Sequence, residues 1–206
     1  MSRESPVYWP QACAELAAHD AVLADLIARY PAVSLVSRGD AFHTLARSIV
    51  GQQISIKAAD TIWTRLNLAL GEINSEQVLS CSVETLRACG LSQRKVEYLA
   101  DLARHAGHLN IAQWREWGDE DIIRELTQIR GIGRWSAEMF LMFYMLRPNV
   151  LPLDDMGLIK GIALHYHAGE RRPRSELATL AATWQPWRSV ATWYLWRSLD
   201  PVPVEY

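Results

Sequence analysis

The chain has 206 residues, half of them hydrophobic, and a formal net charge of −2. This length and composition suit one or two closely packed domains with a real core, and the near-neutral charge argues against a protein that holds polyanions by bulk charge. Three scattered cysteines are too few for a disulfide framework, a four-thiolate zinc site or an iron–sulfur cluster held by this chain alone.

No uninterrupted apolar run reaches membrane-spanning length, and charges at Arg3, Glu4 and Glu15 leave no apolar core for a signal peptide. We therefore expect a soluble, intracellular protein without a membrane partner. It would be cytoplasmic in a bacterium and nuclear in a eukaryote, with its cysteines as reduced thiols.

Apolar residues recur at spacings of three and four, and no strand-like alternation stands out, which predicts an all-α fold. Residues 6–31 contain Pro6 and Pro10 and form a helical segment that Pro31 ends. The next predicted helix stops at Gly51, and the turn sequence GQQIS then leads into another helix.

Residues 81–107 are expected to form two helices separated at Gly90, with Ser92 as the N-cap of the second. Arg94 and Lys95 lie in the first turn of that helix, which is unfavourable for the helix dipole unless they face an anion. A phosphate contact would explain them, and a solvated surface is the commoner explanation.

A sharp corner follows at Gly131-Ile132-Gly133, between two helices. The acidic residues 119–121 are suited to begin the first helix, and the helix predicted after the corner, from Ser136 to Leu146, is apolar on nearly every side. The unpaired amides at the start of this second helix form an anion site. A Gly-x-Gly corner alone is also common in proteins that bind no nucleic acid.

Further along, Leu151-Pro-Leu-Asp-Asp155 places a carboxylate at the entrance of another helix. The run from Leu126 to Ala137, followed at this spacing by Asp155, resembles the helix-hairpin-helix DNA glycosylases. Within them it is most similar to the 3-methyladenine DNA glycosylase II type. The resemblance covers about residues 40–200 and implies a two-lobed helical bundle with a helix-hairpin-helix motif and the active site in the cleft between the lobes.

The resemblance also implies a division of the chain. Residues 1–40 would be an N-terminal helical segment that packs on the C-terminal lobe, with residues 6–31 as a lid or a packing pair of helices. Residues 41–128 would form a helical lobe with the GQQIS loop. Residues 129–206 would hold the hairpin, the catalytic aspartate and the Trp-rich terminal helix. We expect one catalytic unit that works as a monomer.

The family's hairpin holds DNA phosphates without reading sequence, through backbone amides and basic side chains. The matching residues are Arg130, Gly131, Gly133, Arg134 and Ser136. The family often adds a monovalent cation, Na⁺ or K⁺, on hairpin carbonyls, and no other cofactor is expected. The matching carbonyls are those of Thr127, Ile129 and Ile132.

In the family, the loop that matches GQQIS places a side chain in the duplex where the damaged nucleotide has left. Gln53 is the first candidate for this role and Gln52 the second, since an amide can hydrogen-bond the orphaned opposite base. The alternative, equally well supported, is that the two glutamines brace or cap the turn.

The family's aspartate that matches Asp155 lies beneath the flipped nucleotide. A carboxylate there stabilises the oxocarbenium-like sugar and positions or deprotonates the water. Asp155 could instead simply cap its helix, and the two roles are compatible. Asp154 is expected to be structural. A magnesium site of Asp154, Asp155 and Glu138 is an alternative that no further acidic motif supports.

Trp135 occupies the position where strand-cleaving relatives carry a nucleophilic lysine. An indole cannot form the imine, so the resemblance implies a monofunctional enzyme that leaves an abasic site. Trp135 and Trp196 would bind a cationic alkylated purine by their ring faces, with Met139 at a position that is aromatic in some relatives. Core packing is the alternative for the aromatic residues.

These features imply a glycosylase that flips 3-methyladenine and related purines out of double-stranded DNA and hydrolyses the N-glycosidic bond, starting base excision repair. Removal of 7-methylguanine, hypoxanthine or ethenoadenine stays open. The alternative is a non-catalytic helix-hairpin-helix DNA-binding module, which would have no use for Asp155. From Arg130 to Asp200, nine Lys and Arg stand against six Asp and Glu, which favours a local basic surface.

Overall fold

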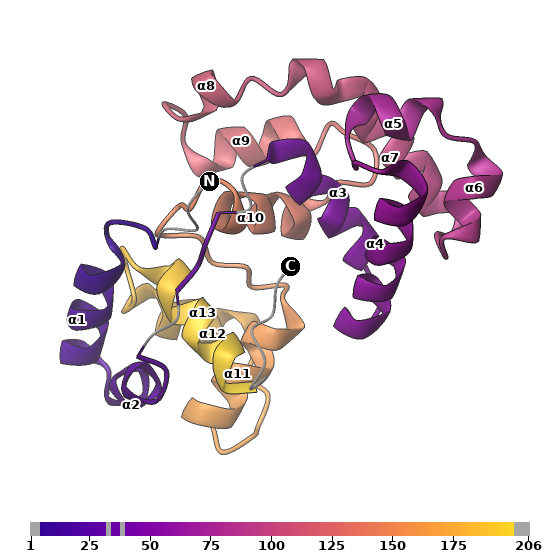
Figure 1. Ribbon diagram of the computed structural model, residues 1–206. Coiled ribbons are helices and arrows are strands. Elements are labelled where there is room, and N and C mark those ends of the chain that lie inside the picture. Colours follow the sequence, from indigo (N-terminus) through magenta and orange to yellow (C-terminus); the bar gives the residue numbers. More distant parts are fainter. Residues whose placement is uncertain (1–4, 32–33, 38–39, 200–206) are drawn as a thin grey trace. The chain divides into compact units, whose positions relative to one another are not determined.

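The computed structural model describes residues 5–31, 34–37 and 40–199, and these ranges contain helices and loops but no strand. The all-α prediction is therefore confirmed (Figure 1). The helices are α1 (Trp9–His19), α2 (Ala21–Arg29), α3 (Ala41–Gly51), α4 (Ile56–Leu70), α5 (Ser75–Ser80), α6 (Val83–Ala88), α7 (Gln93–His105), η1 (Ala106–His108), α8 (Ile111–Trp114), α9 (Asp119–Leu126), α10 (Arg134–Phe143), α11 (Met156–Tyr166), α12 (Arg174–Ala182) and α13 (Arg188–Leu199). Within the described ranges, none of them combines the length and apolarity needed to cross a membrane.

The chain forms two compact units, and the boundary falls inside α10. The first unit contains the described residues up to 37 and from 141 onward, and the second contains those from 40 to 140. The hairpin and the start of α10 thus group with the preceding helices, whereas the predicted division lay between 128 and 129. Packing explains the difference, because Phe140 meets Trp114 edge to face with ring centroids 6.0 Å apart.

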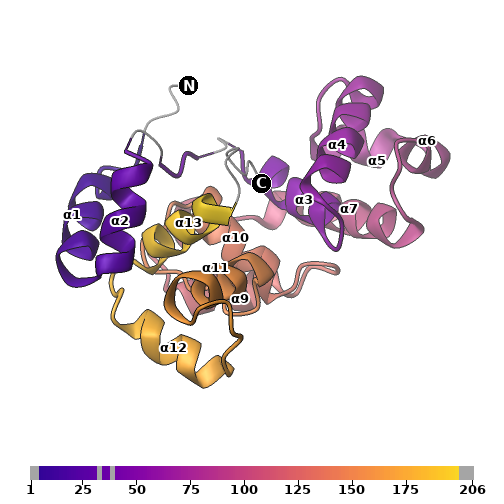
Figure 2. The ribbon, with the colours of Figure 1, turned by 90° about the horizontal axis from the view of Figure 1, so that it is seen from below.

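In the first unit, α1, α2 and α11 all pack against α13. Figure 2 shows α1 and α2 beside α13. The contact is largely aromatic: the rings of Trp9 and Trp193 meet at 89° with centroids 5.5 Å apart. Trp184 is 1% exposed, as core packing requires, whereas Trp187 donates its Nε1–H to Glu15 Oε2 at 2.6 Å. The N-terminal helices therefore complete the core around the last helix.

One carboxylate joins several elements of this unit. Asp20 follows α1 and caps α2, because its Oδ1 accepts the amides of Val22 and Leu23 at 2.9 and 3.0 Å. Its Oδ2 accepts the hydroxyl of Tyr166 at 2.7 Å and the indole N–H of Trp184 at 3.1 Å. The same side chain thus connects α1 and α2 to α11 and to the segment after α12.

In the second unit, α3 packs against α4 and α7, and α5 and α6 pack against α7. Helices α6 and α7 are separated at Gly90, whose φ is 108°. The predicted N-cap of α7 is confirmed, since Ser92 Oγ accepts the amide of Lys95 at 3.3 Å. Arg47, 8% exposed, donates to the carbonyl oxygen of Ala59 at 2.9 Å and so fixes α3 against α4.

Candidate active site

The hairpin between α9 and α10 is a tight turn, closed by the amide of Ile132, which donates to the carbonyl oxygen of Ile129 at 3.0 Å. Gly131 has a φ of 92°, and a Cβ placed on it would lie 2.2 Å from Tyr98 Cγ. Both facts exclude a side chain at position 131. The sequence had not singled out Tyr98, which packs directly on the glycine.

Gly133 is different. It is exposed, and among the described residues no atom lies within 4 Å of the place that its Cβ would occupy. Neither crowding nor a left-handed backbone explains a glycine there. A partner that approaches the backbone closely would explain it, as a DNA phosphate would.

Helix α10 begins directly after the hairpin, and the amide of Ala137 donates to the carbonyl oxygen of Gly133 at 3.1 Å. In general the first amides of a helix have no acceptor within it, and such an end is suited to bind an anion. Ser136, predicted to contact DNA, is 2% exposed, and its Oγ lies 3.1 Å from Gln52 Nε2. Its side chain supports the hairpin from inside, and any phosphate contact of Ser136 would come from its amide.

The two hairpin arginines are paired with acidic side chains. Arg130 donates to Glu97 Oε2 at 2.9 Å, and its guanidinium lies over the ring of Tyr98. Arg134 binds Glu120 through two nitrogens and donates Nε–H to Glu138 Oε1 at 2.9 Å.

The hydrogen bond with Glu120 raises the pKa of Arg134 above its usual range, and it lowers the pKa of Glu120. Glu138 is 3% exposed, so Arg134 also compensates a buried carboxylate. The basic charge that the sequence assigned to the hairpin is therefore balanced locally.

The structure separates the roles of the two glutamines. Gln52 Nε2 donates to the carbonyl oxygen of Gly131 at 2.8 Å, which ties the GQQIS turn to the hairpin. Gln53 is exposed and has a φ of 58°, a left-handed conformation that is uncommon outside glycine and asparagine. Gln52 therefore braces the turn, whereas the side chain of Gln53 is exposed to solvent.

Lys95 is half-buried and does not lie on an open solvated surface, and its ammonium group has partners within the protein. Its Nζ donates to the carbonyl oxygens of Val50 and Gln52, both at 2.8 Å. Burial lowers its pKa. The position of Lys95 in the first turn of α7 is explained by the carbonyl oxygen of Val50, at the end of α3, and that of Gln52, in the turn that follows.

Asp155 is the N-cap of α11, as predicted, and its Oδ1 accepts the amide of Leu158 at 2.7 Å. The same oxygen accepts Nε1–H of Trp196 at 2.7 Å. Asp155 and Trp196 are each 6% exposed. Two hydrogen-bond donors in a buried setting fix the orientation of this carboxylate.

The approach of the indole depends on a glycine. A Cβ on Gly157 would lie 2.9 Å from Trp196 Cδ1 and 3.0 Å from Asp155 Oδ1. The ring of Trp196 also stacks on Phe143, with centroids 6.0 Å apart and planes 9° apart. The sequence had not singled out Gly157, although a glycine in the first turn of a helix, two residues after its cap, is an available signal.

The other predicted pocket residues lie on α10, in the second unit. Trp135 is partly exposed and Met139 is 3% exposed, and their spacing of four residues places them on one face of the helix. Asp155 and Trp196 are brought together in the first unit. The assignment of Trp135, Met139 and Trp196 to a base pocket stays a prediction.

The predicted cation ligands lie where the hairpin begins. Ile129 and Ile132 are joined by the 3.0 Å turn hydrogen bond, and Thr127 ends α9 just before them. Carbonyl oxygens are suitable donors for a hard cation, and a bound Na⁺ or K⁺ here stays a prediction. Across the described ranges, no group of three or more His, Cys, Asp and Glu side chains could hold a metal ion. Asp154 forms an ion pair with Arg174, in keeping with its expected structural role.

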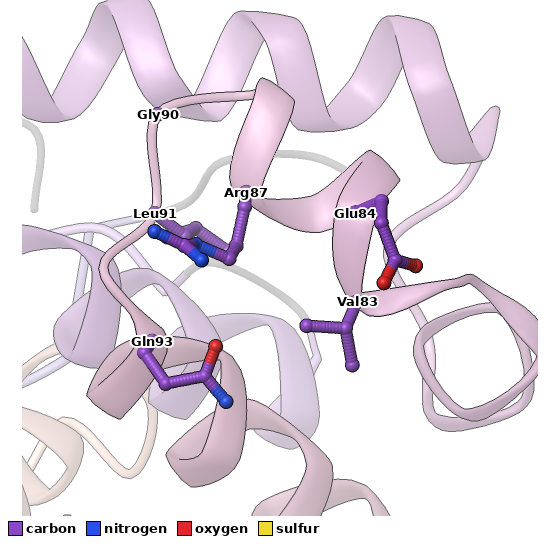
Figure 3. Close-up of a pocket in the computed structure, with 6 residues that line it drawn as sticks. All are labelled: Val83, Glu84, Arg87, Gly90, Leu91 and Gln93. Atoms are coloured by element: carbon purple, nitrogen blue, oxygen red, sulfur yellow. The ribbon is translucent and has the colours of Figure 1, made fainter.

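The second unit contains a hollow of about 500 Å³. Figure 3 shows that its lining comes from α6, the segment that connects α6 to α7, and the start of α7. It is lined by Val83, Glu84, Arg87, Gly90, Leu91 and Gln93. No residue predicted for binding or catalysis belongs to it. It gives no support for a second active site.

Comparisons with known proteins identify a family and several relatives of this chain. A model described as HhH-GPD superfamily base excision DNA repair protein matches residues 46–188. DNA-3-methyladenine glycosylase 1 of Schizosaccharomyces pombe is 30% identical over 186 residues, which are 81% of this chain and 80% of that protein. The chain spans 66% and 63% of the length of two Bacillus subtilis relatives.

Solved structures show the same fold. The S. pombe 3-methyladenine DNA glycosylase in complex with abasic DNA has a TM-score of 0.82 at 27% identity, covering 95% of this chain and 99% of that one. DNA-3-methyladenine glycosidase from Bacillus halodurans has a TM-score of 0.77 at 35% identity, covering 100% and 94%. With a family model that matches more than half of its length, the chain belongs to the HhH-GPD superfamily of base excision DNA repair proteins.

Proposed function

We propose that this protein is a monofunctional DNA glycosylase that releases alkylated, cationic purines, 3-methyladenine among them, from double-stranded DNA. The observation that carries the proposal is the Asp155 carboxylate, held through Oδ1 by the amide of Leu158 and the indole of Trp196, each at 2.7 Å. The relatives named DNA-3-methyladenine glycosylases support the choice of substrate class.

The reaction breaks the bond between the sugar C1′ and the purine nitrogen, and the bonding electrons leave with the base. A cationic alkylated purine departs as a neutral molecule, so no acid is needed to protonate it. The sugar becomes oxocarbenium-like, and the Asp155 carboxylate stabilises its positive charge. Water then adds to C1′, and its proton passes to the carboxylate and on to solvent, which leaves an abasic site.

The geometry of the carboxylate suits this role. Donors on Oδ1 hold it in place before the reaction, so that no reorganisation is needed when charge develops on the sugar. Removal of one such preorganised electrostatic group typically costs about 10²- to 10³-fold in rate. We expect the Asp155 carboxylate to contribute a rate effect of this size.

The base would be held by aromatic faces. A cation over an indole gains about 0.5–2 kcal/mol, so Trp135, which is partly exposed, is the main candidate and Trp196 the second. One face of Trp196 is stacked on Phe143, and Met139 is 3% exposed, so each offers less free surface to a base than Trp135 does.

Substitution of Asp155 tests the proposal directly. Asp155→Asn keeps an oxygen that can accept both N–H groups, so the cap and the fold should survive. We expect release of tritiated bases from methylated DNA to fall by about 10²-fold or more, while binding to a duplex with an abasic-site analogue persists.

Asp154→Asn is the matched control, since the adjacent carboxylate is exposed and pairs with Arg174. It should keep the wild-type rate. Release by Asp155→Asn at the wild-type rate would refute the catalytic assignment. Absence of release by the wild-type protein, with DNA binding intact, would instead favour the non-catalytic DNA-binding module.

The absence of strand cleavage is tested separately. With Trp135 where strand-cleaving relatives have lysine, no amine is expected to attack C1′. Borohydride reduction during the reaction should therefore trap no covalent protein–DNA adduct on a denaturing gel. A trapped adduct would contradict the monofunctional assignment while leaving base release untouched.

A further inference from the structure

The turn between α3 and α4 has a defined geometry. Gln52 has φ −55° and ψ 128°, Gln53 has φ 58°, and the amide of Ile54 lies 3.5 Å from the carbonyl oxygen of Gly51. These values are those of a type II turn with Gln53 at its third position, which normally requires glycine or asparagine. Something other than local preference must hold this turn.

Lys95 is the residue that reaches the turn from another helix. Its ammonium group bonds the carbonyl oxygen of Val50, in the last turn of α3, and that of Gln52, inside the type II turn, both at 2.8 Å. The last carbonyls of a helix have no partner within it and carry its negative end, so a cation is favourable there. Lys95 thus closes α3 and fixes the peptide that precedes Gln53.

The arrangement is costly for Lys95 itself. It lies in the first turn of α7, at the positive end of that helix, and it is half-buried. Burial also lowers the pKa of its side chain. The two carbonyl oxygens that Lys95 binds explain a lysine at this position, whereas its own helix does not.

The turn has a second attachment on its other side. Gln52 Nε2 donates to the carbonyl oxygen of Gly131 and to Ser136 Oγ, at 2.8 and 3.1 Å. The turn is therefore held between α7 and the hairpin, all within the second unit. Between these two attachments, Gln53 is exposed and makes no side-chain hydrogen bond with the described residues that would hold it elsewhere.

We infer that Lys95 is a positioning residue, which acts through Gln53 by locking the type II turn so that the Gln53 side chain is presented to the DNA duplex. The inference rests on the proposed function, in which Gln53 enters the space left by the flipped nucleotide. Lys95 itself touches neither the base nor the reacting sugar. Its contribution is the conformation of the turn.

A double-mutant cycle tests this role. Lys95→Met keeps the aliphatic stem and removes the donors, and we expect it to slow single-turnover base release from methylated DNA by roughly tenfold. Gln53→Ala should slow release to a similar extent. If Lys95 acts through Gln53, adding Lys95→Met to Gln53→Ala causes no further loss. A merely structural lysine would give losses that multiply.

Arg104→Met is the control on the same helix, since Arg104 is exposed near the far end of that helix and pairs with Asp101. It should keep the wild-type rate. Multiplying losses in the cycle, or a wild-type rate for Lys95→Met, would overturn the inference. If Lys95→Met melts too low to be assayed, Lys95→Gln is carried through the same cycle with the same two outcomes.

The failure of the proposed function would be distinct. In that case the wild-type protein releases no base from methylated DNA. The cycle is then run on affinity for a duplex that contains a tetrahydrofuran abasic-site analogue, where Gln53 would still fill the gap. Coupling between Lys95 and Gln53 in that affinity supports the positioning role, and its absence refutes it.

Discussion

Gln53 adopts a backbone conformation that glycine would adopt at lower cost. A non-glycine residue in the left-handed region costs about 1–3 kcal/mol, and the surrounding structure must supply that energy. Only two other non-glycine residues in the described ranges, Leu146 and Ala168, have a positive φ. Where glycine would be more stable, the presence of an exposed glutamine indicates that its side chain is needed.

This trade-off predicts opposite changes in stability and activity. Gln53→Gly should raise the free energy of unfolding by about 1 kcal/mol, since relief of strain exceeds the extra entropy of the unfolded glycine. Base release should fall roughly tenfold if, as proposed, the Gln53 amide enters the duplex, because that amide is lost. Thermal unfolding and single-turnover release measure the two changes.

Ala168→Gly provides the comparison, because Ala168 has a φ of 50° and is exposed just after α11. It should gain similar stability and keep full activity. A Gln53→Gly variant that is less stable than wild type would show that the glutamine is kept for structural reasons. Base release at the wild-type rate would show that the side chain is not needed for activity.

The sequence could not distinguish Gln52 from Gln53. Both amides have the same chemistry, and the GQQIS turn follows from the end of one helix and the start of the next. The distinction arises from contacts of Gln52 with Gly131 and Ser136, which lie 79 and 84 residues further along the chain. Local patterns carry no information on such distant partners.

For the helices, features that depend on residues within one helical turn of each other could be predicted from the sequence. Ser92 and Asp155 cap α7 and α11, and α9 begins with the acidic residues 119–121, as the sequence indicated. The pair of helices expected in residues 6–31 is present, but Asp20, which caps the second of them, was not singled out. Two of the hydrogen bonds of Asp20 come from its own neighbours, and two come from residues more than 140 positions away.

Asp20 should matter more to stability than an ordinary cap. Its carboxylate accepts four hydrogen bonds, so Asp20→Ala loses the cap of α2 and leaves the Tyr166 hydroxyl and the Trp184 indole N–H without this acceptor. Hydrogen bonds to a charged group contribute about 1.5–3 kcal/mol, and we expect a total loss of about 3–5 kcal/mol. Urea unfolding measures this loss.

Asp40→Ala is the matched comparison. Asp40 is the exposed cap of α3, and its carboxylate accepts the amide of His43 at 2.7 Å. Loss of a cap of this kind costs about 1 kcal/mol. Equal losses for the two alanine variants would mean that the bonds of Asp20 to Tyr166 and Trp184 contribute nothing to stability.

For the whole molecule, the basic excess in the C-terminal part of the sequence overstates the charge available to DNA. The two hairpin arginines are paired with Glu97, Glu120 and Glu138, which come from α7, α9 and α10. A count of charges cannot show this pairing, because Arg130 and Glu97 are 33 residues apart. With a net charge of −2, few phosphates should be neutralised when the protein binds.

Removal of one acidic partner should therefore strengthen DNA binding. In Glu120→Gln, Arg134 keeps Glu138 as a partner, and the local charge around the hairpin rises by one. We expect the Kd for an abasic-analogue duplex to fall about two- to fivefold at low salt. The gain should shrink as salt rises, because both side chains of this pair are exposed and counterions screen them.

The salt dependence separates a hairpin effect from a general one. If Arg134 is freed to neutralise one more phosphate, the plot of log Kd against log salt should steepen by about 0.9. Asp121→Asn changes the net charge equally but removes the partner of Arg124, within α9 and away from the hairpin glycines, so its slope should stay near that of wild type. Equal gains and slopes for both variants would mean that Arg134 makes no contact with the phosphates and that binding responds to total charge alone.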